Sequence, residues 1–183
     1  MAKITLVSDK AQVPAEHAAI ADAVLEVFGT IRGPNSVMLY DPPLAKLSLE
    51  LGNFFRYNSI VKSPEKELAI ITGTREKDCL YVWAAQVAAG KRAGLRDEAI
   101  AVVKERREDL AALTLEERDI VTYVRELVRS NRVEEGIFNT LKDRYGVQWL
   151  IEMTTVVGYY GMLAGVVNAF DVPPPADGDV LPV

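Results

Sequence analysis

The stretch that decides the fold runs from residue 63 to residue 95 and reads Ser63-Pro-Glu-Lys-Glu-Leu-Ala-Ile-Ile-Thr-Gly-Thr-Arg-Glu-Lys-Asp-Cys-Leu-Tyr-Val-Trp-Ala-Ala-Gln-Val-Ala-Ala-Gly-Lys-Arg-Ala-Gly-Leu95. Ser63, Pro64 and Glu65 supply an N-cap, a proline at the first helical position and an acid in the first turn, which is how many helices begin. Asp78 predicts the cap of a second helix, and Gly94 predicts its end. We therefore predict two consecutive helices joined by a tight connection.

The two predicted helices bring unusual side chains to facing surfaces. On the first helix, one stripe at positions i, i+3, i+4 and i+7 contains Glu67, Ile70, Ile71 and Thr74. On the second helix, the same spacing gives Cys79, Val82, Trp83 and Gln86. We expect one pocket between the helices to hold Glu67, Cys79, Trp83 and Gln86. A carboxyl group in apolar surroundings has a raised pKa, which would suit Glu67 to general acid or base catalysis. The alternative is a structural role, in which the negative charge of Glu67 in the first turn interacts favourably with the helix dipole.

Nearly every other segment also has the helical period, and none alternates like a strand, so the sequence predicts an all-α protein. Further helices are expected from Pro14 to a break at 29–34, from Asp41, over 97–104, from the capping box Thr114-Leu-Glu-Glu117 to about Asn131, over 133–145 and over 147–170. In the helix after Asp41, one apolar stripe contains Leu44, Leu47, Leu51, Phe54 and Phe55. No linker divides the chain. Residues 1–183 are therefore expected to form a single domain, with a core motif over 34–95 and an extended proline-rich tail over 172–183.

The composition excludes several classes of protein. The 183 residues include 21 Lys and Arg against 26 Asp and Glu, and this net charge of −5 predicts no nucleic-acid or membrane partner. Cys79 is the single cysteine and His17 the single histidine, so we expect no metal, no cofactor and no catalytic triad. The uncharged residues 153–170 are interpreted as a buried helix and not as a membrane span. The N-terminal residues do not read as a signal peptide, and a cytoplasmic location is expected.

Several motifs together resemble the carboxymuconolactone decarboxylase family, whose superfamily includes alkylhydroperoxidase D. The residues that carry the likeness are Pro34-Asn-Ser-Val-Met-Leu-Tyr-Asp-Pro-Pro-Leu-Ala45, Leu51-Gly, Phe55-Arg56, Glu67-Leu-Ala-Ile-Ile71, Tyr81-Val-Trp83, Ala88-Ala-Gly-Lys-Arg-Ala-Gly-Leu95, Asp119-Ile-Val-Thr-Tyr-Val-Arg-Glu-Leu127, Gly158-Tyr-Tyr160 and Asn168-Ala-Phe-Asp-Val-Pro173. The resemblance covers nearly the whole chain. It implies an alkylhydroperoxidase D-like helical bundle that forms dimers, trimers or hexamers, with a small-molecule site between the two helices described above.

The chain departs from the catalytic motifs of that family. In the peroxidase branch, Glu67 and Cys79 match the glutamate and the first cysteine, but Val82 and Gln86 stand where the second cysteine and the histidine belong. In the decarboxylase-like branch, whose motif is Tyr-Glu-Trp-x-x-His, Tyr81 and Trp83 are kept, while Val82 and Gln86 replace glutamate and histidine. Neither valine nor glutamine shuttles a proton, although glutamine still orients a carbonyl or carboxylate group.

The remaining candidates each have a plain structural alternative. Cys79 near a helix N-terminus is a candidate nucleophile with a lowered pKa, or else a small packing residue. Arg56 is a candidate to bind a substrate carboxylate, or forms a surface ion pair. Tyr160 is a candidate hydrogen-bond donor to the ligand, or packs in the core. Tyr81, Trp83 and Gln86 are expected to line the substrate pocket.

Three functions follow from these residues. The first is acid–base chemistry of the lyase, isomerase or hydratase type on a small carboxylated or cyclic compound, with Glu67 as the acid or base. The second is a thiol peroxidase that uses Cys79 and an external reductant. The third is an oligomeric binding protein without catalytic activity, which the residues at positions 82 and 86 favour over an unmodified decarboxylase.

Overall fold

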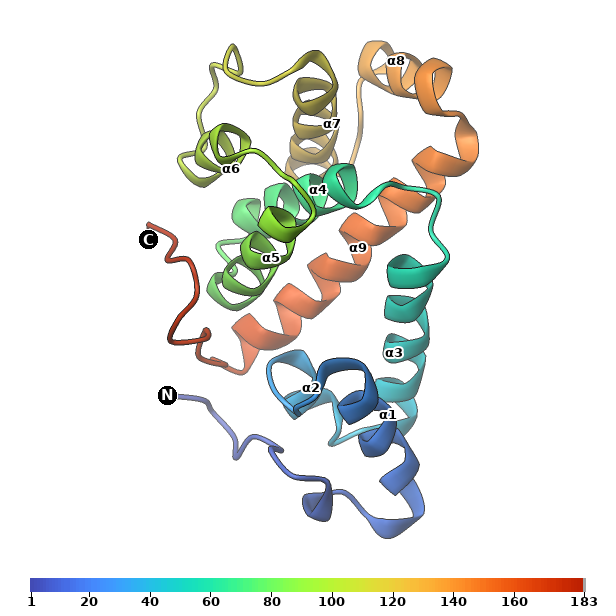
Figure 1. Ribbon diagram of the computed structural model, residues 1–183, viewed down its shortest axis with the longest axis vertical. Coiled ribbons are helices and arrows are strands. Elements are labelled where there is room, and N and C mark those ends of the chain that lie inside the picture. Colours follow the sequence, from blue (N-terminus) through green and yellow to red (C-terminus); the bar gives the residue numbers. More distant parts are fainter. Residues whose placement is uncertain (183) are drawn as a thin grey trace.

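The computed structural model describes residues 1–182, and its regular elements in that range are all helical. Figure 1 shows a bundle in which α4 lies at the centre and α9 runs diagonally across the molecule. The α-helices are α1 (Ala18–Phe28), α2 (Pro34–Met38), α3 (Pro42–Tyr57), α4 (Ser63–Glu76), α5 (Leu80–Arg92), α6 (Asp97–Lys104), α7 (Leu115–Ser130), α8 (Glu135–Tyr145) and α9 (Val147–Ala169). The predicted all-α class is therefore confirmed.

Helix α4 is the centre of the core and packs against α5, α6, α7 and α9. Ile70 and Ile71 are at most 1% exposed, as the predicted stripe requires. The two buried threonines of α4 donate their hydroxyls to carbonyl oxygens one turn earlier, Thr72 to Leu68 at 2.7 Å and Thr74 to Ile70 at 2.9 Å. Because these hydroxyls are satisfied within the helix, α4 can be apolar toward its neighbours on nearly every side.

Several predicted helix boundaries are confirmed and others are wrong. Thr114 and Glu117 form the reciprocal capping box at the start of α7. The helix expected from Pro14 begins only at Ala18, because the preceding residues form two short 3₁₀ turns. The short helix α2 follows the predicted break at 29–34 and is not among the predicted helices.

The connection between α4 and α5 also differs from the prediction. Asp78 does not cap α5: its backbone has a positive φ of 46°, and its carboxylate pairs with Arg75 and Arg106. Cys79 occupies the N-cap position instead, and no side chain caps this helix end. At the start of α4, Lys62 is the N-cap residue, and Ser63 is the first helical residue.

Helix α9 joins two hydrophobic clusters, one around α4 and one built by α1, α2 and α3. Its inner face is buried: Met153, Val156 and Ala164 are fully covered. Within residues 1–182, α9 is the one helix long and apolar enough to cross a membrane, a test that core helices also pass. Its packing against α4, α5 and α8 supports the interpretation as a core helix.

The apolar stripe of α3 does not face the core. Leu44, Leu47, Leu51 and Phe54 are between 38% and 63% exposed, and of the predicted stripe only Phe55 is buried. The core side of α3 is formed by smaller residues, including Ala45, Ser48 and Gly52, which approach α1 and α9. The exposed stripe is therefore an apolar surface that no part of residues 1–182 covers.

The sequence predicts an extended proline-rich tail, but its described residues, 172–182, contain a turn closed by the hydrogen bond from Gly178 N–H to the Pro175 carbonyl oxygen. This part of the tail packs against α5. The carboxylate of Asp179 accepts hydrogen bonds from the Trp83 indole N–H at 2.9 Å and from the Lys104 ammonium group at 2.6 Å. Leu181 inserts into the α4 cluster and is 2% exposed. The tail therefore covers the Trp83 side of α5 and leaves the opposite side free to form a cavity.

Candidate functional site

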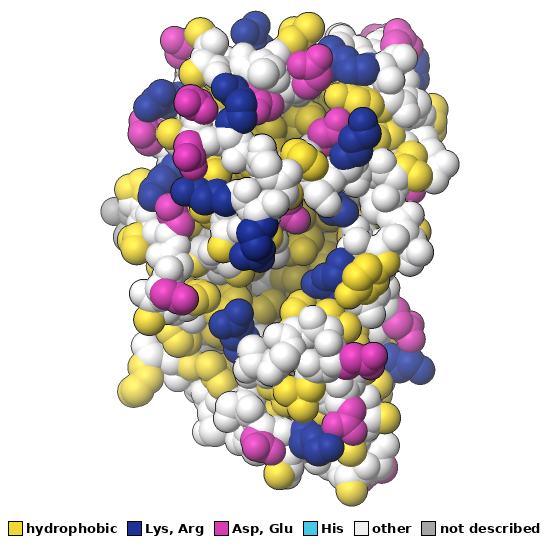
Figure 2. Space-filling view, in the orientation of Figure 1, with side chains coloured by type: hydrophobic (Ala, Val, Ile, Leu, Met, Phe, Trp, Pro, Cys, Tyr) yellow, Lys and Arg dark blue, Asp and Glu magenta, His cyan; other side chains and the backbone are white. Residues whose placement is uncertain are grey.

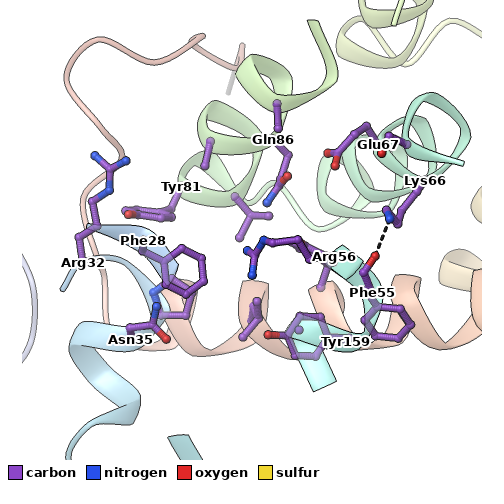
Figure 3. Close-up of a pocket in the computed structure, with 18 of the residues that line it drawn as sticks. Phe28, Arg32, Asn35, Phe55, Arg56, Lys66, Glu67, Tyr81, Gln86 and Tyr159 are labelled. Atoms are coloured by element: carbon purple, nitrogen blue, oxygen red, sulfur yellow. Dashed lines mark hydrogen bonds between the residues drawn. The ribbon is translucent and has the colours of Figure 1, made fainter. Parts of the chain in front are cut away.

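A cavity of about 350 Å³ lies between α3, α4, α5 and α9 and the segment that leads into α2. Figure 2 shows it as a hollow with a hydrophobic floor and basic side chains around its rim. Figure 3 shows the polar lining residues converging on this space from different helices. The apolar part of the lining includes Phe28, Phe55, Val82 and Leu163.

Glu67 supplies the one carboxyl group of the cavity lining. Its Oε2 atom is buried and has no hydrogen-bond partner among the described residues. Burial raises the pKa of Glu67 to about 7, against the opposing charges of Lys66, Arg92 and Arg56. Glu65, not Glu67, is the acid in the first turn of α4, so the helix-dipole interpretation does not explain this side chain. At neutral pH Glu67 is therefore able both to donate and to accept a proton.

Basic side chains dominate the rest of the polar lining. Arg32, Arg56, Lys66 and Arg92 all line the cavity, and none forms an ion pair within residues 1–182. Arg56 instead lies over the ring of Phe28, 4.8 Å from its centroid, and donates a hydrogen bond to Asn53. The predicted surface ion pair of Arg56 is absent from the described chain. The cavity is therefore positive although the chain as a whole carries a net charge of −5.

Lys66 differs from the three arginines because it is buried, with 7% of its surface exposed. Its ammonium group donates a hydrogen bond to the carbonyl oxygen of Phe55, the last buried residue of α3 (Figure 3). Burial lowers the pKa of Lys66, and the nearby charge of Arg56 acts in the same direction. The carboxylates of Glu67 and Glu152 oppose this shift.

Helix α5 contributes Tyr81, Val82 and Gln86 to the cavity wall. The ring of Tyr81 packs directly on Gly33: a β-carbon at that glycine would lie 2.4 Å from the ring. Gly33 also has φ +60°, a conformation that favours glycine. The close contact holds Tyr81 between α5 and the start of α2, where its side chain faces the cavity (Figure 3).

The prediction that one pocket holds Glu67, Cys79, Trp83 and Gln86 is only half right, since Cys79 and Trp83 do not line it. Cys79 is fully buried in the α4 cluster, and burial raises the pKa of its thiol. The expected lowering of this pKa by the helix N-terminus is therefore wrong, although backbone N–H groups of Tyr81 and Val82 do act in that direction. Trp83 points to the other side of α5, toward Asp179 of the tail.

Tyr159 and Tyr160 of α9 form the wall opposite α5. The Tyr159 hydroxyl donates a hydrogen bond to the backbone oxygen of Ser48 at 3.0 Å, which fixes its ring beneath α3. Burial raises the pKa of Tyr160, and the nearby charge of Glu67 contributes in the same direction. Tyr160 is therefore a neutral hydrogen-bond donor close to Glu67.

Sequence reasoning missed Lys66, Arg32 and Arg92 as site residues. Lys66 lies in the charged run at the start of α4, Arg32 in a helix break, and Arg92 in the last turn of α5, all of which read as solvent-exposed positions. Only the approach of α3 and α2 to the α4–α5 pair brings them to one cavity. No cluster of His, Cys, Asp and Glu side chains within residues 1–182 has the arrangement of a metal site.

Comparison with known proteins finds similar structures but no similar sequence. No protein-family model and no curated protein matches the sequence. An alkylhydroperoxidase AhpD core from Ralstonia eutropha JMP134, described as an uncharacterized peroxidase-related protein, superposes with a TM-score of 0.78 at 12% identity, covering 96% of this chain and 93% of that chain. An uncharacterized peroxidase-related protein from Silicibacter sp. TM1040 gives a TM-score of 0.77 at 17% identity, with the same coverage of 96% and 93%.

A third similar structure is that of the debrominase Bmp8, in a cysteine-to-alanine variant bound to 2,3,4-tribromopyrrole. Its TM-score is 0.72 at 16% identity, and the match covers 96% of this chain and 95% of that chain. These proteins have different described activities, so the likeness establishes a shared helical architecture over almost the full length of each chain.

Proposed function

Because the chain has the alkylhydroperoxidase D-like fold, we propose that its cavity performs acid–base chemistry on a small carboxylated compound, with Glu67 as the proton-transfer group. The reaction class is that of a lyase or isomerase, in which a proton moves to or from a carbon or oxygen of the substrate. The observation that carries the proposal is the unpartnered Oε2 atom of Glu67, which lies in a cavity that otherwise presents cations.

The pKa of Glu67 supports its role. General acid–base catalysis is most effective when the pKa of the catalytic group lies near the working pH, and burial places that of Glu67 at about 7. Tyr160 and Gln86 line the same cavity and supply a hydroxyl and an amide to orient a substrate oxygen. Proton transfer is thereby assigned to α4, while α5 and α9 position the substrate.

The charges of the cavity support a carboxylate as the substrate group. Arg32, Arg56 and Arg92 have no acidic partner among the described residues, and guanidinium groups bind carboxylates through paired hydrogen bonds. A volume of about 350 Å³ limits the ligand to a small molecule. The apolar floor fits the hydrocarbon part of such a compound, open-chain or cyclic.

The position of Cys79 counts against the peroxidase alternative. Peroxide reduction needs an accessible thiolate, whereas Cys79 is fully buried and its pKa is raised. Val82, not a thiol, faces the cavity from α5. The peroxidase-related and debrominase descriptions therefore stay with the similar structures and are not extended to this chain.

The test is a screen of small carboxylic acids and lactones against the wild-type protein, with thermal shift to detect binding and product analysis to detect turnover. The matched variants are Glu67→Gln, which keeps the shape and removes the titration, and Glu50→Gln on the exposed surface of α3. We expect turnover to be lost in Glu67→Gln and kept in Glu50→Gln. Turnover that survives Glu67→Gln would overturn the assignment, and binding without turnover in all three proteins would indicate the non-catalytic binding protein.

A further inference from the structure

Lys66 combines features that the proposed acid–base role of Glu67 does not use. Among the lysines of residues 1–182 it alone is buried, and it still lines the cavity. It forms no ion pair in that range, and its one described hydrogen bond goes to the backbone oxygen of Phe55. Figure 3 shows Lys66 and Glu67 near the start of α4, with the Lys66 ammonium group directed at the carbonyl oxygen of Phe55.

We propose that Lys66 is a nucleophile that forms a Schiff base with the carbonyl carbon of a small oxo acid. This inference rests on the proposed function and deepens it, because it names both the substrate class and a second catalytic residue. The carboxylate of the oxo acid would be held by the arginines of the cavity, which leaves its carbonyl group beside Lys66 and Glu67.

The surroundings of Lys66 favour the neutral amine that this chemistry requires. Lysines become nucleophiles when they are desolvated or lie close to another cation, and Lys66 meets both conditions through its burial and the neighbouring Arg56. The groups that oppose this effect are Glu67 and Glu152. Of these, Glu67 is itself largely protonated below a pH of about 7 and then adds little negative charge. An amine that donates one hydrogen to Phe55 keeps its lone pair free for attack.

The proposed covalent step balances with the groups in the cavity. The Nζ lone pair attacks the carbonyl carbon, the C=O π electrons move to oxygen, and that oxygen takes a proton from Glu67. Glu67 regains a proton from the attacking nitrogen, which gives a neutral carbinolamine. Glu67 then protonates the hydroxyl group, water leaves, and the nitrogen lone pair forms the protonated imine. The sum is one oxo acid, one neutral lysine amine and the proton of Glu67, converted to one imine cation, one water and the Glu67 carboxylate.

A 3-oxo acid would react further from the imine. The bond to its carboxylate breaks, carbon dioxide leaves, and the electron pair moves to the imine nitrogen to give an enamine. Glu67, after taking a proton from solvent, protonates the enamine carbon. Water then adds to the imine carbon and releases the ketone and the free lysine. The imine nitrogen acts as the electron sink, so this lyase reaction needs no oxidant or reductant.

The test is reductive trapping. The wild-type protein is incubated with pyruvate, acetoacetate or levulinate in the presence of cyanoborohydride, and the modified lysines are mapped by peptide mass spectrometry. We expect the adduct at Lys66 to exceed that at any other lysine by more than about tenfold, since a bound oxo acid is held beside this amine and exposed lysines lack such a site. Lys66→Met removes the site with similar volume, and Lys62→Met on the exposed start of α4 is the control.

The outcomes separate this inference from the proposed function. An adduct confined to Lys66, both in the wild type and in Lys62→Met, supports the Schiff base. The peptide map of the wild type gives this result even if Lys66→Met does not fold. Thermal shift with the same oxo acids is measured in parallel. Binding without an adduct at Lys66, or adducts spread over exposed lysines, overturns the Schiff base and leaves the acid–base function standing. If oxo acids neither bind nor form an adduct while other carboxylates bind, only the Schiff base is overturned. If no carboxylate binds, both the Schiff base and the acid–base function are overturned.

Discussion

Glu67 has an unfavourable position for a charged group. Its carboxyl group faces a cavity and has no hydrogen-bond partner for the buried Oε2 atom among the described residues. A buried carboxylate without a partner destabilises a fold, and active sites commonly contain such groups. The same burial that makes Glu67 a suitable proton-transfer group should therefore be measurable as a loss of stability.

We expect Glu67→Gln to be more stable than the wild type at pH 8 and similar to it at pH 4. The pKa of Glu67 rises from 4.5 in the unfolded chain to about 7 in the fold, so between these values the unfolded chain loses a proton that the fold keeps. Wild-type stability consequently falls as the pH rises through this window. The shift corresponds to at most about 3 kcal/mol at about 1.4 kcal/mol per unit.

Urea unfolding of both proteins at the two pH values measures this difference, and the titrating groups that do not interact with Glu67 cancel in the comparison. An equal difference in unfolding free energy at pH 4 and pH 8 would contradict the raised pKa of Glu67.

Cys79 should behave as a packing residue. Because the thiol is fully buried and its pKa is raised, little thiolate is available in the folded protein. We expect iodoacetamide to modify Cys79 only at the rate of unfolding, and dithiol-dependent peroxide consumption to equal the background. Peroxide turnover in the wild type that disappears in Cys79→Ser would show that the thiol is activated after all.

At the scale of the elements, α5 separates two environments. One side, with Tyr81 and Gln86, faces the cavity, whereas the other, with Trp83, is covered by the tail. The helical spacing predicted correctly that Val82 and Gln86 share a face, but it assigned Cys79 and Trp83 to the same pocket. The side that Trp83 faces depends on Asp179, which is distant in sequence, and no local pattern signals that contact.

The bond between the tail and α5 should contribute measurably to stability. Asp179→Ala leaves the buried Trp83 N–H without an acceptor and removes the partner of Lys104. The expected loss is about 1–3 kcal/mol, together with faster proteolysis within residues 171–182. Asp177→Ala, two residues away on an exposed part of the same tail, is the control. If the two variants are equally stable in thermal unfolding, the tail does not depend on this bond.

At the scale of the whole molecule, the sequence predicted the architecture better than the site. Capping signals and helical periodicity are local, which is why the sequence predicts the two helices within residues 63–95 and the start at Thr114. The N-cap residues of the two helices are nevertheless Lys62 and Cys79, not the predicted Ser63 and Asp78. The site depends on how α2, α3 and α9 pack against the α4–α5 pair, and this arrangement buries Lys66 and brings the exposed Arg92 to the same cavity. The same packing turned the α3 stripe outward, although its spacing is equally compatible with a core-facing helix.

The exposed stripe of α3 leads to a prediction about assembly. Leu44, Leu47, Leu51 and Phe54 form a row of exposed apolar side chains, a feature typical of protein–protein contact surfaces. We expect copies of the chain to associate through this row, in line with the dimers, trimers or hexamers that the family resemblance implies. Leu47→Asp should yield a smaller species in light scattering after size exclusion, whereas Leu115→Asp, equally exposed on α7, should not. A wild-type protein that elutes as a monomer at high concentration would refute this.

The two tryptophans lie in different parts of the molecule, and this gives the protein an intrinsic optical reporter. Trp83 follows the cavity residue Val82 and is hydrogen-bonded to the tail. Trp149, in the first turn of α9, stacks on Tyr145 with ring centroids 4.3 Å apart. Fluorescence emission from Trp83 therefore senses the contact between α5 and the tail, whereas the indole N–H of Trp149 donates to Glu65. Detachment of the tail can thus be followed in real time without an attached dye.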